Sequence, residues 1–121
     1  MEVNKEQLYD ALGELIYAVA KADGLVQEEE TARLEELLFA HPWAREIKWS
    51  FNYEKGKQNS VQEAYEKALE TCKNYGQSKE YPFLFEVLEA IAKASGGMDT
   101  LEKEIIEKFK GELKEHFVHK Y

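Results

Sequence analysis

Four acidic residues in two short segments are the strongest candidates for chemistry in this sequence. Asp23 and Glu30 bracket one glycine-containing segment, and Asp99 and Glu102 follow a second. Carboxylate oxygens are the ligands that Ca²⁺ and Mg²⁺ prefer in proteins. If the fold brings the two segments together, these side chains form an acidic cluster. The sequence therefore predicts a divalent-cation site, with Ca²⁺ or Mg²⁺ as the bound ion.

An EF-hand, helix capping and a protein contact are the other interpretations of the same residues. The spacing resembles an EF-hand loop with Gly24 sixth and Glu30 twelfth, but Val19 and Lys21 would then stand at positions that need oxygen ligands. The pattern therefore argues against an EF-hand. Glu30 and Glu102 also fit the third position of a helix, where a Glu side chain accepts the N–H of the cap residue. Helix capping, without any ion, accounts for most of this pattern, and a protein-contact role is a further alternative.

The remaining candidates for catalysis carry weaker signals. Cys72 lies on an apolar helical stripe and is predicted to be a small buried side chain rather than a reactive thiol. His116 and His119 have a spacing that can hold a transition metal, but two ligands seldom make a site. His41 has no evident base or nucleophile as a partner. We therefore predict no catalytic residue and no enzymatic activity.

A partner-binding surface is predicted in the segment 41–57. It combines aromatic residues with the one locally basic stretch of the chain, and both aromatic residues and Arg are enriched in binding hot spots. An aromatic connector between two halves of the domain is the alternative, because aromatic residues are often buried. The residues predicted to bind the partner are Trp43, Arg45, Lys48 and Trp49.

Composition and charge limit the classes of function. The chain has 121 residues, a formal net charge of −8 and a single cysteine, which excludes an internal disulfide. The negative field disfavours binding to nucleic acid or to an anionic membrane surface. The polar N-terminal segment is no signal peptide, and the longest apolar stretch is too short to span a bilayer. We expect a cytoplasmic protein with a protein partner, a homodimer being one alternative.

Helical periodicity predicts the elements that must position these residues. No segment alternates as a half-buried strand does, so a single all-α domain of about six to seven helices over 1–121 is expected. The segment 52–60 is predicted to be a loop. The last helix is predicted to turn Leu101, Ile105, Phe109, Leu113 and Phe117 inward. Helices are predicted over 4–22, 28–40, a short piece after Pro42, 60–75, from 78–82 to Gly96, and from 99 onward.

The sequence contains an internal repeat. Residues 15–38 align with residues 87–110 without a gap, and Gly24 matches Gly96 at the break between two helices. Each half is then an incomplete helix–loop–helix unit that buries its apolar face against the other. Further matching pairs are Ala18 with Ala90, Val19 with Ile91, Ala20 with Ala92, Glu30 with Glu102, Leu34 with Ile106 and Glu35 with Glu107.

Residues 22–30, ADGLVQEEE, are similar to the A-D-G-x-(apolar)-x-x-x-E signature of the tellurite-resistance TerB family. The resemblance implies a compact helical bundle of two pseudo-symmetric hairpins, a fold shared with the N-terminal region of a membrane-anchored DnaJ-like co-chaperone. It also implies an acidic surface with an ion- or partner-binding role. The expected function is a protein-interaction module in tellurite or general stress response, with a divalent-cation-binding domain as the alternative. Ser95 replaces the signature Asp in the second copy.

Overall fold

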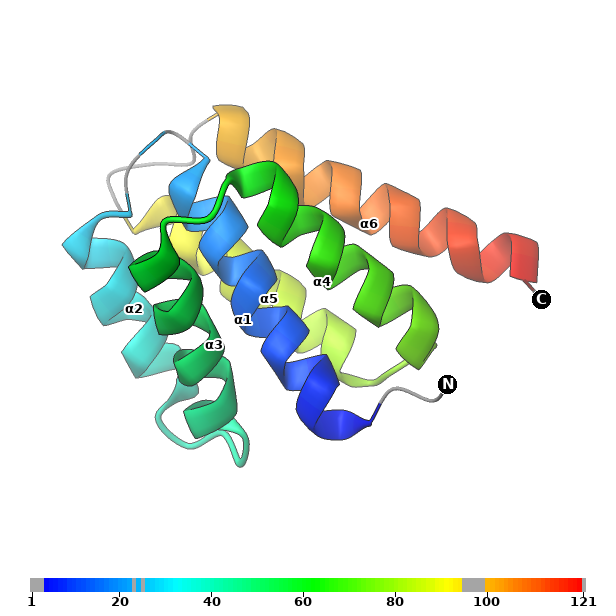
Figure 1. Cartoon of the computed structure of the whole chain (residues 1–121), viewed down its shortest axis with the longest axis horizontal. Coiled ribbons are helices and arrows are strands. Elements are labelled where there is room, and N and C mark those ends of the chain that lie inside the picture. Colours follow the sequence, from blue (N-terminus) through cyan, green and yellow to red (C-terminus); the bar gives the residue numbers. More distant parts are fainter. Residues whose placement is uncertain (1–3, 23, 25, 95–99, 121) are drawn as a thin grey trace.

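The protein is all-helical in the part that its computed structural model describes, residues 4–22, 24, 26–94 and 100–120 (Figure 1). Within these residues there is no strand, as the sequence predicted. No helix among them is long and apolar enough to cross a membrane. The six helices are α1 (Lys5–Lys21), α2 (Glu28–Leu38), α3 (Ala44–Lys57), α4 (Val61–Tyr75), α5 (Glu80–Lys93) and α6 (Thr100–Lys120).

Local capping chemistry sets several helix ends. The Asn4 side chain accepts the N–H of Gln7, and the Gln7 side chain accepts the N–H of Asn4, which closes the capping box that begins α1. The hydroxyl of Ser60 accepts the N–H of Glu63 at the start of α4. Gly76 ends α4 with a φ of 97°, a conformation that costs glycine little. These ends are therefore determined by residues adjacent in sequence.

Helix α1 forms the centre of the bundle. It contacts α3, α4, α5 and α6, and Figure 1 shows it flanked by α3 and α4 with α5 behind. Because it is covered on several sides, it buries much more than one stripe of side chains. The buried residues of α1 are Leu8, Tyr9, Ala11, Leu12, Gly13, Leu15, Ile16, Tyr17, Ala18, Val19 and Ala20.

Helices α1 and α3 pack closely because one residue between them has no side chain. A Cβ atom placed on Gly13 would lie 2.5 Å from the carbonyl oxygen of Ile47 and 2.7 Å from the Cβ of Ser50. The backbones could not approach this closely around any larger residue. This crossing positions the outer face of α3 beside α1.

The predicted loop over 52–60 is wrong, because α3 continues to Lys57. Phe51 and Glu54 are one helical turn apart and both are buried, so packing maintains the helix despite the polar and glycine residues around them. The helix ends where Gln58 adopts a left-handed conformation, with a φ of 53°, and donates its N–H to the carbonyl oxygens of Glu54 and Lys55.

The predicted inner face of α6 is partly wrong. Leu101 is 51% exposed, whereas Glu102 and Ile106 are fully buried. The inner face begins one residue later than the apolar pattern indicates, and Phe109 and Leu113 then continue it as predicted. A buried carboxylate at Glu102 is what a pattern of apolar residues alone cannot predict.

Residues 72 positions apart have matching surroundings in the two repeats. The pairs Val19–Ile91 and Glu30–Glu102 are buried at both members. Helix α2 contacts α5, and helix α6 contacts both α1 and α5, so each second helix packs at least in part on the first helix of the other repeat. This exchange of contacts is the arrangement expected when each hairpin completes the apolar core of the other.

Candidate functional site

Helix α3 presents an exposed pair of aromatic side chains. Trp49 is 60% exposed and Tyr53 is 44% exposed, and they lie one helical turn apart. Their rings are stacked, with centroids 5.3 Å apart and planes inclined by 19°. The Lys57 ammonium lies 5.6 Å from the centroid of the Tyr53 ring. These contacts hold large apolar surfaces in a fixed orientation while leaving them accessible to solvent.

A surface pocket of about 290 Å³ lies beside this pair, between α1 and α3. Its lining combines the Trp49 indole with groups that carry charge at neutral pH. Two of the four residues predicted to bind a partner, Arg45 and Trp49, are therefore brought together here, whereas Lys48 is not part of the lining. The lining residues are Glu6, Asp10, Arg45, Glu46 and Trp49.

Negative charge dominates this pocket. Burial raises the pKa of Asp10, and the nearby carboxylates of Glu6 and Glu46 raise it further. Among the residues that the structure describes, neither Arg45 nor any of the three carboxylates forms an ion pair. The three carboxylates therefore repel one another, and Arg45 is the one cation among the lining residues.

Trp43 lies elsewhere and serves a different role. It is half-buried, packs against the core and stacks on the ring of Tyr9 with centroids 4.8 Å apart. Its backbone N–H donates a hydrogen bond of 2.9 Å to Nδ1 of His41. The structure thus separates Trp43 from the exposed aromatic pair on α3.

His41 has a carboxylate partner, which its sequence neighbours do not show. Because Nδ1 accepts the Trp43 N–H, the ring proton of the neutral imidazole is on Nε2, which lies 3.3 Å from a Glu80 carboxylate oxygen. The other oxygen accepts a hydrogen bond of 2.8 Å from the Tyr9 hydroxyl. Burial, followed by the bond to Glu80, raises the pKa of Tyr9. Both imidazole nitrogens are occupied, so the arrangement holds α1 and α5 against the α2–α3 connection.

Two of the four predicted metal ligands can be described, and both are buried. Glu30 accepts the N–H of Gln27 at 2.9 Å, in the capping role that the sequence offered as an alternative. Glu102 is completely buried near the start of α6. Asp23 and Asp99 lie outside the described residues. Within the described part, no group of three or more His, Cys, Asp or Glu side chains could hold a metal ion, a finding that does not include the complete predicted cluster.

Cys72 and His116 are the remaining sequence candidates whose side chains the structure describes. Cys72 is buried as predicted, and burial raises the pKa of its thiol to about 12, which keeps it protonated at neutral pH. His116 is half-buried on α6, with its ring edge-on to Phe117. The side chain of His119 lies outside the described residues.

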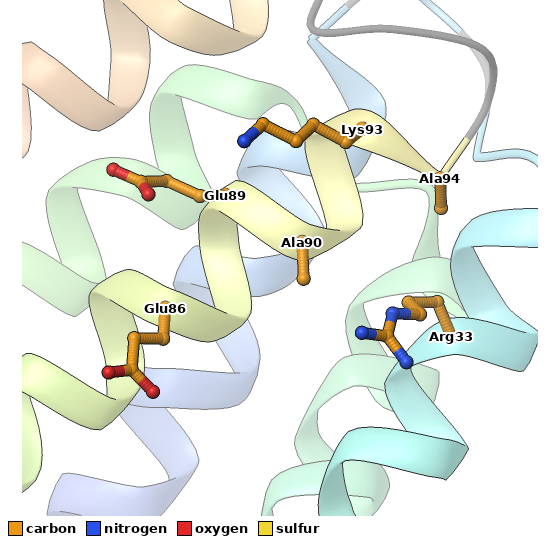
Figure 2. Close-up of a pocket in the computed structure, with 6 residues that line it drawn as sticks. All are labelled: Arg33, Glu86, Glu89, Ala90, Lys93 and Ala94. Atoms are coloured by element: carbon orange, nitrogen blue, oxygen red, sulfur yellow. The ribbon is translucent and has the colours of Figure 1, made fainter.

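A second pocket, of about 380 Å³, lies between α2 and α5 (Figure 2). Arg33 extends from α2 toward α5, and the small side chains of Ala90 and Ala94 leave the space open. The charges around it are balanced and partly paired: Arg33 lies 3.5 Å from Glu36, and Glu89 lies 3.0 Å from Lys110. This pocket therefore has no charge preference comparable to that of the α1–α3 pocket.

Sequence reasoning missed Glu6 and Asp10 as members of the α1–α3 pocket. Both lie on α1, far from Trp49 in sequence, and only the close crossing at Gly13 brings them near α3. The available signal was the charged Asp10 between the apolar residues Tyr9 and Ala11 of α1. Asp10 is half-buried and marks a point where α1 reaches the surface.

Comparison with known proteins identifies the family. Residues 9–114 match the family model described as "Tellurite resistance protein TerB". No curated protein and no solved structure matches the chain. The match covers all six helices in whole or in part and agrees with the resemblance of residues 22–30 to the family signature. The chain therefore belongs to the tellurite-resistance TerB family.

Proposed function

We propose that the protein is a non-enzymatic protein-interaction module acting in a tellurite or general stress response in the cytoplasm. Membership of the TerB family supports the stress context. The observation that carries the interaction role is the stacked and exposed pair of Trp49 and Tyr53 on α3. The proposed partner is another protein.

The chemistry of this pair suits a binding hot spot. Trp and Tyr contribute large apolar areas with few rotatable bonds, so ordering them in a complex costs little conformational entropy. The stack between Trp49 and Tyr53 restricts them further before any partner binds. A pocket adjoins Trp49, and hot-spot side chains cluster at such pockets. Exposed apolar groups release free energy when a partner removes them from water, so these two rings favour formation of a complex.

Genetic complementation tests this function. In a tellurite-sensitive host lacking its own TerB protein, expression of the natural chain should restore growth on tellurite. The double variant Trp49→Ala with Tyr53→Ala should not restore growth, although its melting temperature should remain within a few degrees of the original because both side chains are exposed. Circular dichroism checks that the variant is folded.

Phe39→Ala provides the matched control, because Phe39 is a 91% exposed aromatic residue that ends α2 and does not belong to α3. This variant should restore growth as the natural chain does. Growth restored equally by the double variant would contradict the proposal. Loss of growth with both variants would show that exposed aromatic residues matter in general, which would also contradict it.

We propose divalent-cation binding by the two loop segments as the second candidate function. The observation that favours it is the matching place of Glu30 and Glu102 in the two repeats, each in the first turn of the second helix of its repeat, because carboxylate oxygens are preferred ligands of Ca²⁺ and Mg²⁺. Asp23 and Asp99 would supply the other carboxylates. A cation at one hundred times its dissociation constant should stabilise the fold by about 2.7 kcal/mol.

Thermal unfolding with Ca²⁺, Mg²⁺, Mn²⁺ and Zn²⁺ tests this candidate. Asp23→Asn should reduce any increase in melting temperature, whereas Glu104→Gln, an exposed residue on α6, should leave it unchanged. An absence of any ion-dependent increase would remove the cation candidate and leave the capping interpretation of Glu30.

A further inference from the structure

We propose that the α1–α3 pocket receives a lysine or arginine side chain from a basic segment of the partner protein. The inference rests on the proposed interaction function and names the chemistry of the partner. It is carried by three features that coincide in one place: an excess of carboxylates over cations, an exposed indole and a cavity of about 290 Å³ between them.

The charges of the pocket favour a cation. Glu6 and Asp10 extend from α1, and Glu46 extends from α3, so carboxylates lie on two sides of the cavity. Arg45 is the one cationic residue in the lining, which leaves an excess of negative charge. Since none of these groups has an ion-pair partner among the described residues, an incoming ammonium or guanidinium group would not have to displace one.

The aromatic wall favours a cation carried on an apolar stem. The face of an indole attracts a lysine or arginine head group more strongly than other aromatic rings do, and the methylene stem can pack on the same surface. The same kind of interaction already occurs three times among the described residues, once with the Lys110 ammonium 5.2 Å from the Phe85 ring centroid. The Lys57 ammonium lies 5.6 Å from the Tyr53 ring centroid, and the Lys108 ammonium lies 4.9 Å from that of Tyr65. Trp49 is the exposed ring that lines a cavity between carboxylates.

The occupant is a protein segment, for two reasons. A free metal ion or a small polyamine would use the carboxylates but would leave the stacked surface of Trp49 and Tyr53 uncovered. A second copy of this chain carries a net charge of −8, so association of two copies would bring like fields together. A basic segment of another protein complements both the charge and the aromatic surface.

Binding of labelled peptides tests the assignment. Fluorescence anisotropy would measure the dissociation constants of fluorescein-labelled octalysine and octaglutamate at about 50 mM and about 300 mM salt, a range over which screening weakens charge contacts strongly. The natural chain should bind octalysine, more weakly at the higher salt, and should not bind octaglutamate. Glu46→Gln should weaken octalysine binding by about two- to fivefold, as expected for one partly exposed charge pair.

Matched variants separate the pocket from the general negative field. Glu104→Gln removes the same charge from an exposed position on α6 and should change the dissociation constant less than twofold. Trp49→Leu should weaken binding by about tenfold, because it removes the indole face from the centre of the site. Trp49→Phe keeps an aromatic face and should retain most of the affinity.

Three results would overturn the assignment. Equal effects of Glu46→Gln and Glu104→Gln would show that only the overall charge matters. Unchanged octalysine binding by Trp49→Leu would show that the Trp49 ring does not contribute to the site. Equally tight binding of spermine, with the same dependence on the variants, would show that a small cation is sufficient.

The test also distinguishes this inference from the function on which it rests. If octalysine fails to bind while the double alanine variant on α3 still loses tellurite protection, the interaction function stands and the basic segment is excluded. If octalysine binds with the expected dependence while the double variant protects the host normally, the pocket assignment stands and the proposed function is excluded.

Discussion

The side-chain hydroxyl of Ser50 donates a hydrogen bond of 2.6 Å to the main-chain carbonyl oxygen of Asp10, which joins α3 to α1 beside the charged pocket. One turn along α1, Gly13 allows the two backbones to meet. Asp10 belongs to the pocket lining, and Ser50 follows Trp49 directly. The geometry of the pocket therefore depends on a crossing formed by small and buried residues.

Gly13→Ala should destabilise the fold by about 2–4 kcal/mol, because the added methyl group would overlap the Ile47 carbonyl oxygen and force the helices apart. Urea unfolding followed by circular dichroism measures this change. Gly111→Ala is the control, since a Cβ atom on Gly111 in α6 meets nothing within 4 Å. That variant should gain up to about 1 kcal/mol from helix propensity. Equal stability of Gly13→Ala and the natural chain would contradict the close approach.

Lys67→Met should destabilise the fold by about 2–4 kcal/mol at pH 7, because it removes the cation that bridges two carboxylates. The Lys67 ammonium lies 3.2 Å from Glu14 and 3.1 Å from Glu54, which is fully buried. Burial raises the pKa of Glu14 even though Lys67 opposes the shift. Removing Lys67 should raise this pKa further, so the loss of stability should shrink as the pH falls and Glu14 becomes neutral.

Unfolding free energies at pH 7 and pH 4 check the Lys67 prediction. Lys55→Met provides the control, because Lys55 is exposed on α3 and forms no ion pair among the described residues. Lys55→Met should change the unfolding free energy by no more than about 0.5 kcal/mol at either pH. A destabilisation by Lys67→Met that grows toward acid pH would have the wrong sign for this mechanism.

Tyr81→Phe should cost about 1–2 kcal/mol at pH 7, because the buried hydroxyl donates to the carbonyl oxygens of Gly76 and Cys72. Burial, followed by the contacts with Cys72, raises the pKa of Tyr81 above its ordinary value of 10.0. The folded state thus retains a proton that the unfolded chain releases. The contribution is present below pH 10 and is lost as the pH rises above it.

Urea unfolding at pH 8 and at pH 11 measures this dependence. The difference in unfolding free energy between the natural chain and Tyr81→Phe should be smaller at the higher pH. Tyr53→Phe serves as the control, because the Tyr53 ring is exposed rather than buried, and this variant should show no such narrowing. A difference in unfolding free energy that grows with pH would contradict the proposal that the folded chain retains the Tyr81 proton.

Cys72 should resist alkylation in the folded protein. Burial excludes the reagent and raises the pKa of the thiol to about 12, so almost no thiolate exists at pH 8. Iodoacetamide labelling followed by mass spectrometry should show reaction at a rate limited by unfolding. In urea the thiol should react like a free cysteine. Rapid labelling of the folded chain would show that the α4 segment around Cys72 is open.

The features that the sequence predicted correctly depend on nearby residues. The capping pair of Asn4 and Gln7 specifies the start of α1, and Gly76 specifies the end of α4, because a few adjacent residues determine the hydrogen bonds. The family signature near Gly24 is likewise local. Helix number and class follow from such signals and from apolar periodicity.

The features that the sequence did not predict depend on contacts between distant residues. Glu102 occupies a buried position that an apolar pattern assigns to Leu101, because packing of α6 against the bundle decides the register. The contact between His41 and Glu80 spans 39 residues, and nothing near His41 indicates it. The Trp49 pocket likewise requires a second helix whose crossing depends on Gly13.

The central position of α1 has a consequence for how the chain is made in the cell. Each helix that covers α1 follows it in sequence, and α5 and α6 are synthesised much later. A nascent α1 therefore leaves the ribosome with its apolar side chains exposed to solvent. They remain exposed until most of the domain has been translated. Chaperones that hold apolar segments act during such intervals. The time between the synthesis of α1 and the synthesis of the helices that cover it is therefore the period in which the nascent chain is most vulnerable to aggregation.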